Sequence, residues 1–433
     1  MAKKDKSEDK AVRRKNHSVA ARVVVGIVIV LVCIVLAVVI RYATSINNFL
    51  DKITHKEPEV KEYSVVVLDS SEIKELAGLS GKSVGFLKID EKAGNAEQHL
   101  EEKVKIEANF YDDLDTLASV LNNKIVDAIT IETGQMEVLE DEVSDAVKNI
   151  RVIYKFEIQL DAENVEVSDK QVTEEPFILY ISGSDSRNGI KATARSDVNI
   201  IAVVNPAKGK ILLVSIPRDT YVQLHGTTGI KDKLTHAGVY GINMSKTTIE
   251  DFLGVKIDYT TKVSFGTVVK VVDELGGIEI DSDQEMTLPA GDKKCTYTLG
   301  KQKVDGTCAL RFARERKSYQ SGDRHRGENQ MQVISSIIAK LSSSKSYVLN
   351  LPNILDIAAD SFETSFTRDE ISAFIRMQLG RGTNWDVKSI SIEGTGSMQG
   401  TYSMGANRPL YVMIANPDSV VNAQAKIKEY LEL

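Results

Sequence analysis

The sequence predicts an α/β protein: a three-layer α/β/α domain with a mixed central sheet, preceded by a small α/β accessory domain and one N-terminal transmembrane helix. Three observations predict this class. An unbroken apolar run occupies residues 23–40, strand and helix patterns alternate over residues 63–160, and nearly continuous apolar strands alternate with helical stripes over residues 176–433. A chain of 433 residues is long enough for two or three domains.

The N-terminus combines a basic tail with a membrane-length apolar run. Residues 1–22 hold eight lysines and arginines against three acids, and residues 23–40 lack polar side chains before Arg41. As a helix this run spans roughly 27 Å, close to a hydrocarbon core of about 30 Å. A cleaved signal peptide, the alternative, usually has a shorter apolar region that ends in small residues. We therefore expect a single-pass protein of the cell membrane, with its N-terminus in the cytoplasm and the rest extracellular.

Residues 41–62 are predicted to be a spacer, and residues 63–160 a small accessory domain. Strands are expected at 64–68, 82–89, 126–131 and 150–158, and an apolar stripe predicts a helix at 112–121. We expect its acidic side chains to form only a solvated surface: Glu137, Glu140, Asp141, Glu142 and Asp145. The domain either binds an unidentified ligand or partner, or holds the following domain at a set height.

An acidic, polar linker at 161–175 precedes the larger domain, residues 176–433. Strands are expected at 177–182, 198–204, 211–216 and 387–392, and the turn Asn-Pro-Ala-Lys-Gly predicts an antiparallel hairpin between the second and third. Because these strands are apolar almost throughout, helices should cover both faces of the sheet. Helices are expected at 245–253, 266–275, 305–313, 327–341, 368–379 and 418–431.

Two cysteines fall in the part expected outside the cell. Cys295 and Cys308 are thirteen residues apart and flank a loop. Extracellular pairs are more often bridged than free, so we expect a disulfide. Two unpaired thiols are the alternative, because spacing alone does not fix the geometry. Cys33 lies in the apolar run and is expected to act there as a small apolar residue.

Arginines and aspartates gather where the apolar strands end, in segments 181–197, 212–222 and 310–330. The planar guanidinium suits phosphate because it donates in pairs and stays charged. Aspartate suits Mg²⁺, which prefers hard oxygen ligands alongside substrate phosphates. The combination predicts phosphoryl chemistry.

The motifs that carry these charges occur in a recognisable order. They are GSDSR (183–187), RSD (195–197), SIPRDTYV (215–222), KLTHAGVYG (233–241), DELGGIEI (273–280), VDGTCALRFARER (304–316) and GDRHRGENQ (322–330). Over roughly residues 175–430 the chain resembles the LytR-CpsA-Psr (LCP) family. The accessory domain together with GDRHRGENQ is most similar to the capsule-locus CpsA branch of that family.

This resemblance implies a membrane-anchored phosphotransferase that attaches a polyprenyl-pyrophosphate-linked glycopolymer, here a capsular polysaccharide, to peptidoglycan. Asp185 and Asp197 correspond to the positions associated with Mg²⁺, for which Mn²⁺ is the alternative ion. The pyrophosphate-binding positions correspond to Arg195, Arg218, Arg314, Arg316 and Arg326, with Gln330 as a nearby polar contact. The resemblance implies a catalytic role for Asp185, Asp197, Arg195, Arg218 and Arg316. Asn329 departs from the pattern, because many relatives have an arginine there.

These residue types suit the reaction because the charged oxygens of a diphosphate repel nucleophiles. Mg²⁺ on Asp185 or Asp197 and a collar of arginines would neutralise those oxygens as charge moves to the leaving lipid phosphate. The nucleophile would be a sugar hydroxyl, so no Ser-His-Asp set is required, and either aspartate could accept its proton. The resemblance also implies that apolar strands wall a tunnel for the lipid, which periodicity alone does not distinguish from an ordinary core.

The individual residues also have structural interpretations. The run 314–317 could be a solvated helix end, Asp197 a turn cap, Arg218 and Asp219 a local ion pair, and His236 a packed loop histidine. Two other functions compete: a membrane-bound regulator of capsule synthesis whose basic tail contacts nucleic acid, and a polyprenyl-pyrophosphate hydrolase. Nucleic acid is not expected as the main partner, because the short tail contains no helix-turn-helix and would bind only electrostatically. The sequence leaves the oligomeric state open.

Overall fold

The computed structural model describes residues 60–159, 168–184, 190, 192–319, 322–344, 347, 361–381 and 385–432. All of these residues belong to one compact unit. Within the described ranges, none of the helices combines the length and apolarity that a membrane span needs. The apolar run at 23–40 and the basic tail before it lie outside the described residues.

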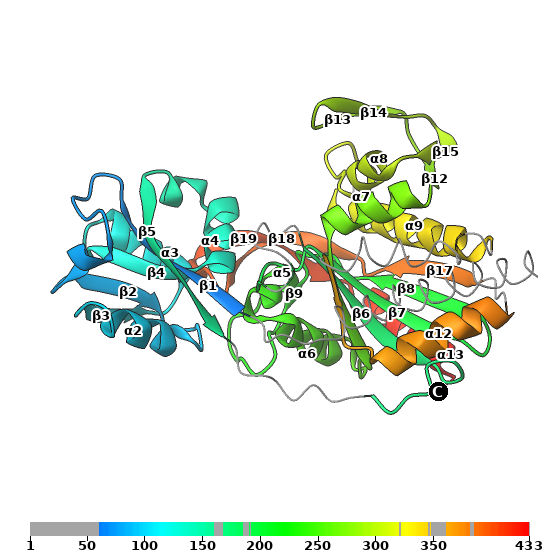
Figure 1. Ribbon diagram of the computed structural model, residues 1–433, viewed down its shortest axis with the longest axis horizontal. Coiled ribbons are helices and arrows are strands. Elements are labelled where there is room, and N and C mark those ends of the chain that lie inside the picture. Colours follow the sequence, from blue (N-terminus) through cyan, green and yellow to red (C-terminus); the bar gives the residue numbers. More distant parts are fainter. Residues whose placement is uncertain are drawn as a thin grey trace, which may run out of the picture. The chain divides into compact units, whose positions relative to one another are not determined.

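The accessory domain is built on a mixed five-stranded sheet with the order β3-β2-β4-β1-β5 (Figure 1). Its strands are β1 (Val60–Leu68), β2 (Ser83–Leu87), β3 (Glu107–Tyr111), β4 (Ala128–Glu132) and β5 (Ile150–Gln159). β1 runs antiparallel to β4 and β5, whereas β2 runs parallel to β3 and β4. Because Val60 pairs with Gln159, the first strand begins inside the segment predicted to be a spacer.

Helices cover both faces of this sheet. α2 (Ala93–Glu101) packs on one face, while α3 (Leu114–Asn122) and α4 (Thr133–Glu142) pack on the other, with short 3₁₀ turns η1 (Leu76–Leu79) and η2 (Ser144–Val147). Alternation along β1 divides the two cores: Val65 and Val67 belong to the α2 side and Val66 to the α3 and α4 side. The predicted helix at 112–121 corresponds to α3, which starts after the N-cap Asp113.

The central sheet of the larger domain has six strands in the order β16-β11-β6-β7-β8-β17. They are β6 (Phe177–Ser184), β7 (Val198–Asn205), β8 (Lys210–Ser215), β11 (Tyr259–Ser264), β16 (Phe362–Thr364) and β17 (Asp386–Ser391). The predicted hairpin between β7 and β8 is antiparallel, and so is the pair of β6 with β7. β11 runs parallel to β6 and β17 parallel to β8, so the sheet is mixed, as predicted.

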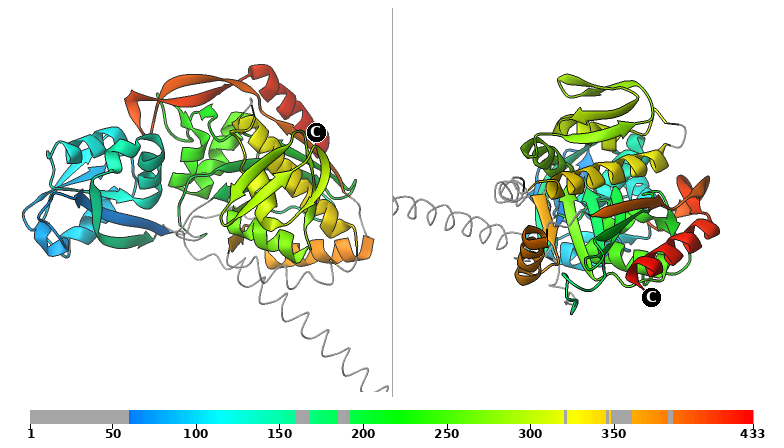
Figure 2. Two further views of the ribbon diagram at one scale, coloured as in Figure 1. Left: turned by 90° about the horizontal axis from the view of Figure 1, so that it is seen from above. Right: turned by 90° about the vertical axis from the view of Figure 1, so that its right-hand side faces the viewer.

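The larger domain has the predicted three layers (Figures 1 and 2). On one face, α6 (Ile242–Leu253) and α13 (Pro417–Leu431) pack against Tyr180, Ile201 and Val214. On the other face, α9 (Asp323–Ser342) and α12 (Arg368–Arg381) pack against the alternate strand positions, including Ala202 and Leu213. Both faces of β6, β7 and β8 are therefore apolar, which explains their nearly continuous hydrophobic sequences.

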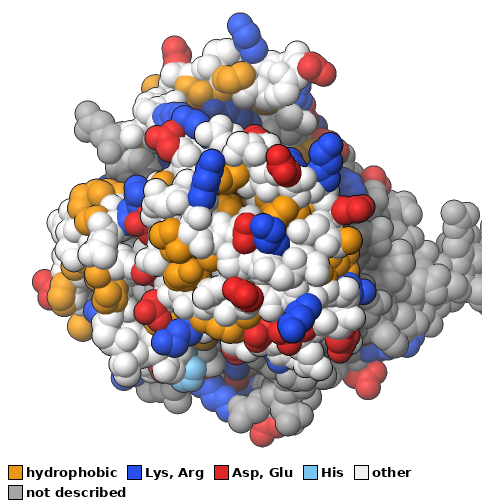
Figure 3. Space-filling view, turned by 90° about the vertical axis from the view of Figure 1, so that its left-hand side faces the viewer, with side chains coloured by type: hydrophobic (Ala, Val, Ile, Leu, Met, Phe, Trp, Pro, Cys, Tyr) orange, Lys and Arg blue, Asp and Glu red, His pale blue; other side chains and the backbone are white. Residues whose placement is uncertain are grey.

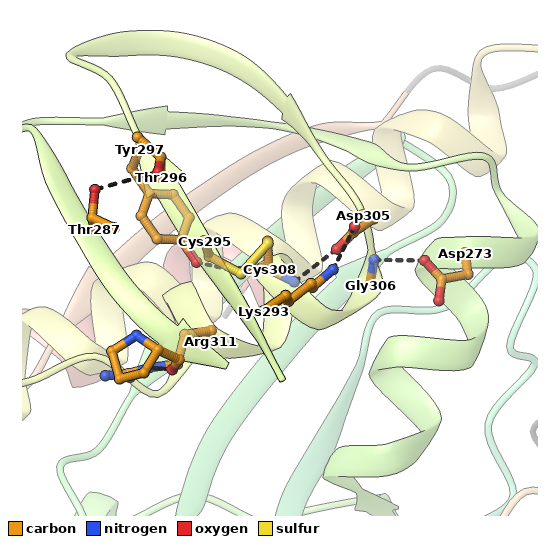
Figure 4. Close-up of a disulfide and its surroundings, with 11 residues drawn as sticks. Asp273, Thr287, Lys293, Cys295, Thr296, Tyr297, Asp305, Gly306, Cys308 and Arg311 are labelled. Carbon is orange, nitrogen blue, oxygen red and sulfur yellow. Dashed lines mark hydrogen bonds and ion pairs between the residues drawn. A yellow bond between two sulfur atoms is a disulfide. The ribbon is translucent and has the colours of Figure 1, made fainter. Parts of the chain in front are cut away.

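A smaller lobe carries the disulfide. It consists of α7 (Phe265–Glu274), α8 (Gly306–Ala313) and two hairpins, β12 (Ile278–Ser282) with β15 (Gly300–Val304) and β13 (Met286–Ala290) with β14 (Lys293–Tyr297). The predicted bridge between Cys295 and Cys308 is confirmed and joins β14 to α8, with a Cα–Cα distance of 5.5 Å (Figure 4). Asp305 Oδ1 caps α8 by accepting the Cys308 N–H at 2.9 Å. The start of α8 is thus held by a covalent bond and a cap.

A C-terminal hairpin joins the two domains. β18 (Gly394–Thr401) and β19 (Gly405–Ala415) pair antiparallel, and their hairpin reaches from the larger domain to the accessory domain (Figure 2). Met404 at the turn and Leu410 on β19 are buried in the same hydrophobic cluster as α3 and α4. Two strands and two short helices complete this region: β9 (Tyr221–Val222), β10 (Asp232–Lys233), α5 (Leu234–Ala237) and η3 (Gly238–Tyr240). Val239 of η3 belongs to the same cluster, so both domains contribute to one core.

The surface at the accessory-domain end of the described residues carries charges of both signs. Figure 3 shows positive and negative side chains interspersed with hydrophobic ones on this face. Among the residues that the structure describes there, neither sign of charge gathers into one patch.

Candidate active site

Seven of the predicted site residues line one cavity of about 560 Å³, hereafter the polar pocket. They are Arg195, Asp197, Arg218, Arg314, Arg316, Arg326 and Gln330. The eighth, Asp185, lies outside the described residues, and Ser184 directly before it lines the same cavity. Segments separated by more than a hundred residues in the sequence therefore converge on a single space.

One edge of the central sheet brings Asp197 and Arg218 together. Because β6, β7 and β8 are antiparallel neighbours, the end of β6, the start of β7 and the end of β8 lie side by side. Arg218 Nη1 donates to Asp197 Oδ1 at 2.6 Å, and both side chains are about six-sevenths buried. Arg218 Nε also lies 3.7 Å from Asp219 Oδ1. The local ion pair between Arg218 and Asp219 is therefore present in addition to the pair between Arg218 and Asp197.

The segment that carries Arg195 and Asp197 is held close to α5 and η3. The Ser196 N–H donates to the Thr235 carbonyl at 3.0 Å, and the Asp197 N–H donates to the Gly183 carbonyl at 2.9 Å. A Cβ at Gly238 would lie 2.5 Å from the Ala194 carbonyl oxygen, so only glycine permits this approach. The KLTHAGVYG motif thus serves to position the segment.

His236 of the same motif has a structural environment. It is buried, its Nδ1 lies 2.7 Å from Asp232 Oδ1, and it is not among the residues that line the polar pocket. The packed-histidine interpretation therefore agrees with its environment.

Two arginines reach the polar pocket from the end of α8. Arg314 is the C-cap of α8, and its guanidinium lies 5.0 Å from the centre of the Phe265 ring, a cation–π contact. Arg316 follows two residues later on the same pocket wall. Glu315 between them is buried and accepts from the Ser318 N–H at 2.8 Å and from Arg311 at 2.6 Å. Although burial raises the pKa of Glu315, these donors outweigh it and lower the pKa.

Arg326 and Gln330 lie one turn apart on α9 and line the pocket together. Between them, a Cβ at Gly327 would lie 2.6 Å from Ser215 Oγ, so this glycine allows α9 to approach the end of β8. Asn329 is 3% exposed and donates from Nδ2 to the Phe312 carbonyl at 3.2 Å. It ties α9 to α8 and is not among the pocket-lining residues, so it supplies no donor in place of an arginine there.

The opposite wall of the polar pocket comes from the accessory domain, and no sequence pattern identified it. Ser64, Thr133, Met136, Glu137, Glu140, Asp141, Val152 and Lys155 line it. The expectation that the acidic side chains of α4 form only a solvated surface is therefore wrong. The spacing of residues 137, 140 and 141 indicates one helix face, but only the fold shows what that face contacts.

Three acids of α4 form ion pairs across the domain boundary. Asp141 pairs with Arg195, Glu137 Oε2 lies 4.0 Å from Arg195 Nε, and Glu142 pairs with the buried Lys233. Burial raises the pKa of Glu137, and nearby Asp197 raises it further, while Arg195 opposes the shift. The acidic face of α4 thus forms part of the wall of the polar pocket.

The described residues would hold a divalent ion only if a bound substrate supplied further ligands. No group of three or more His, Cys, Asp or Glu that could hold a metal occurs within the described part of the chain. Asp197 lines the pocket, and Mg²⁺ commonly uses one or two carboxylates together with substrate phosphates and water. Asp197 and a bound diphosphate would form a donor set of that kind.

A second, apolar cavity of about 380 Å³ lies between the sheet and the helices α9 and α12. Its sheet side consists of alternate residues of β6, β7 and β8: Phe177, Leu179, Ile181, Ala202, Val204, Ile211 and Leu213. Its helix side includes Ile334 and Ile338 of α9 and Phe374 and Ile375 of α12. Residues 326, 330, 334 and 338 of α9 are four residues apart and lie on one face of the helix. The first two line the polar pocket and the last two line the apolar cavity.

Comparison with known proteins agrees with the arrangement of these motifs. The sequence profile of the LytR_cpsA_psr family matches residues 142–418, which is more than half of the chain. The chain belongs to the LytR-CpsA-Psr family. The LytR-CpsA-Psr match begins at the end of α4 and leaves β1 to β4 and nearly all of α4 outside it.

Named relatives are identical to the chain at about a third of the positions in the aligned regions. An Enterococcus faecalis protein named polyisoprenyl-teichoic acid–peptidoglycan teichoic acid transferase TagU is 34% identical over 246 residues, 55% of this chain and 78% of that protein. The protein of the same name from Bacillus subtilis is 33% identical over 270 residues, 61% of this chain and 82% of its own. The crystal structure of B. subtilis TagV has a TM-score of 0.50 at 28% identity, covering 60% of this chain and 98% of that one.

Proposed function

We propose that the protein is a phosphotransferase that attaches a polyprenyl-diphosphate-linked glycopolymer to peptidoglycan. The convergence of five arginines on one pocket carries the proposal. Relatives at 33–34% identity are named as transferases of a polyisoprenyl-linked polymer to peptidoglycan, which supports the same class of reaction.

The two cavities match the two parts of such a substrate. Guanidinium groups of the polar pocket would bind the diphosphate, and the apolar cavity would bury part of the polyprenyl chain. One stripe of α9 runs from Arg326 and Gln330 to Ile334 and Ile338, and β6 runs from Ile181 to Ser184, so both elements line both cavities. A lipid diphosphate could therefore lie along them with its head in one cavity and its chain in the other.

The chemistry follows from the pocket. A peptidoglycan hydroxyl attacks the phosphorus that carries the glycopolymer, a new P–O bond forms, and the P–O bond to the lipid phosphate breaks. The hydroxyl proton passes to a base, and the polyprenyl phosphate leaves. Arg218, Arg314, Arg316 and Arg326 would neutralise the phosphate oxygens as negative charge moves to the leaving group. Mg²⁺ held by Asp197, with Asp185 as the second carboxylate that the sequence suggests, would add Lewis-acid charge stabilisation.

The polymer we propose is a capsular polysaccharide. The support is the resemblance of GDRHRGENQ and of the accessory domain to the capsule-locus branch. The named relatives carry teichoic acid in their names, so lipid-linked teichoic acid is the comparison substrate. If teichoic acid were transferred and capsular polymer were not, the polymer assignment would be wrong while the reaction class stands.

We further propose that residues 23–40 anchor the chain in the membrane with the described domains outside the cell. The bridge between Cys295 and Cys308 supports this placement, because disulfides persist in oxidising compartments. A membrane-impermeant amine reagent applied to intact cells should label exposed lysines of the described domains, such as Lys301, whose side chain is 70% exposed. Labelling only after lysis would contradict the placement.

Transfer by the full-length protein in nanodiscs tests the function. With lipid-linked polymer, peptidoglycan and Mg²⁺, we expect Arg218→Ala to lower the rate by about 10²–10³, as loss of one preorganised charge donor does elsewhere. Arg376→Ala, which removes an exposed guanidinium from α12, is the matched control and should leave the rate unchanged.

Two results would contradict the proposal. Full transfer by Arg218→Ala would show that the polar pocket is not the site. Release of polymer phosphate at the same rate without peptidoglycan would show a hydrolase, in which water replaces the sugar hydroxyl.

A further inference from the structure

The segment 192–197 is held from two sides, and one side is the accessory domain. The larger domain fixes its backbone through Thr235 and Gly183. From the accessory domain, Val60 forms a parallel bridge with Ala192 and Glu132 Oε1 accepts from Thr193 Oγ1 at 2.8 Å. Two residues later, Asp141 pairs with the Arg195 guanidinium.

One carboxylate links the start of α4 to this segment. Glu132 is the N-cap of α4: its Oε2 accepts the Gln135 N–H at 3.1 Å in a capping box, while its Oε1 accepts from Thr193. Glu132 is 1% exposed and Thr193 2%, so both are shielded from water. Because α4 starts at this contact, Glu137 and Asp141, four residues apart, lie on the helix face that meets Arg195.

The accessory domain is also firmly packed on the larger domain. Val239, Met404 and Leu410 complete the α3 and α4 core, and Glu142 pairs with the buried Lys233. A separate ion pair joins Asp115 to Arg408, and neither of these two residues lines the polar pocket. The face of α4 is therefore fixed relative to Arg195 by contacts independent of Arg195 itself.

Arg195 needs such a partner. It shares the polar pocket with four other arginines, and like charges at this range repel. A guanidinium has five donors in a rigid fork, so a carboxylate that binds one nitrogen also sets the direction of the others. The Arg195 side chain is 15% exposed, and its Nε has no hydrogen-bond partner within the described part of the chain.

We propose that Glu137 and Asp141 of the accessory domain are positioning residues for Arg195, and that the accessory domain is thereby a working part of the transferase site. This inference rests on the proposed function. The two carboxylates lie outside the stretch that matches the family profile, so they distinguish this chain from the shared core of the family.

The test uses the full-length protein and the Asp141→Asn variant, which keeps the side-chain shape but removes its charge. We expect kcat for transfer to fall roughly tenfold, with the KM for peptidoglycan and the melting temperature unchanged, because the directed guanidinium rather than the fold is lost. Asp141→Glu should restore part of the rate. Asp115→Asn, which breaks the other ion pair between the domains, is the matched control and should retain full activity.

A double-mutant cycle separates positioning from docking. In an Arg195→Ala background, Asp141→Asn should have no further effect, because it acts through Arg195. An unchanged or higher rate in Asp141→Asn, additive losses in the cycle, or an equal loss in Asp115→Asn would each overturn the inference. If Arg195→Ala and Arg218→Ala both retain full transfer, the proposed function fails instead. If Arg195→Ala and Arg218→Ala lose transfer while Asp141→Asn does not, the positioning role is wrong and the proposed function stands.

Discussion

The polar pocket and the apolar cavity share a sheet and a helix, yet they are built in different ways. The apolar cavity is lined mainly by alternate positions of three strands and one stripe each of α9 and α12, with Phe366 and Trp385 from the segments next to α12. The polar pocket draws on the ends of β6 and α8, the segments before β7 and after β8, the first turns of α9 and a second domain. An apolar surface thus follows from the periodicity of regular structure, whereas a charged site depends on where separate segments end and on the ion pairs that hold them.

Breaking the disulfide should affect the polar pocket and spare the apolar cavity. Cys295 and Cys308 brace α8, which ends at Arg314, and a loop of this length contributes about 3 kcal/mol in the chain-entropy view. The double variant Cys295→Ser with Cys308→Ser should lose about that much unfolding free energy in urea titration.

Below its melting temperature the same variant should bind inorganic pyrophosphate more weakly than the wild type. It should bind a neutral polyprenol, which carries no phosphate, as the wild type does. Equal loss of both ligands would contradict the distinction between the two cavities.

Proton binding should matter at the start of α4, the helix that carries the acidic wall of the polar pocket. Burial raises the pKa of Glu132 to about 7, against an opposing effect of Lys61. The pKa of this carboxyl is near 4.5 in the unfolded state and about 7 in the native state. Between these pH values the native state binds more protons than the unfolded state. The stability that Glu132 contributes at low pH is therefore lost as the pH rises through 7.

Glu132→Gln should therefore match the wild type at pH 5 and exceed its unfolding free energy at pH 8 by up to about 3 kcal/mol. Glu157→Gln, at an exposed position on β5, is the control and should differ from the wild type equally at both pH values. A gain of the same size at pH 5 would indicate a packing effect instead of a titration.

Filling the apolar cavity should give the smallest of these effects, and it tests whether the two cavities bind different parts of the substrate. Ile375→Trp on α12 places a larger ring in the space proposed for the lipid chain. Affinity for a long-chain polyprenyl diphosphate should fall about tenfold, or about 1.4 kcal/mol, while inorganic pyrophosphate should bind unchanged. Val421→Trp, at an exposed position on α13, controls for a surface tryptophan. A loss of pyrophosphate binding in Ile375→Trp would show that the cavities are not separable.

Regular elements with strong periodicity were predictable from the sequence. The expected helices at 245–253, 266–275 and 305–313 correspond to α6, α7 and α8, whose ends differ by three residues at most. α9 starts at Asp323, four residues before the expected start, because its first turn is charged and carries no apolar stripe. The β18–β19 hairpin was not predicted, because the glycines of β18 give a weak strand signal. β11 was also missed, although its Tyr, Thr and Val residues favour a strand.

The site was predictable only where the motifs lie. Arg195, Arg218 and Arg326 stand in recognisable sequence contexts, and the fold brings them together. α4 has few apolar residues and its acids look like solvent-facing charge, so local sequence gives no reason to place them against Arg195. That contact arises from tertiary packing between the two domains, which periodicity does not encode.

The C-terminal hairpin has a consequence for the order in which the chain can fold. Met404 is fully buried and Leu410 nearly so within a core whose other members are mostly residues 66–147. During synthesis the last strand of the accessory domain, which ends at Gln159, is complete about 250 residues before these two side chains are made. Until Met404 and Leu410 have been made, the hydrophobic core that they share with α3 and α4 stays incomplete, so a chain that stops before them would leave this core open to proteases and chaperones.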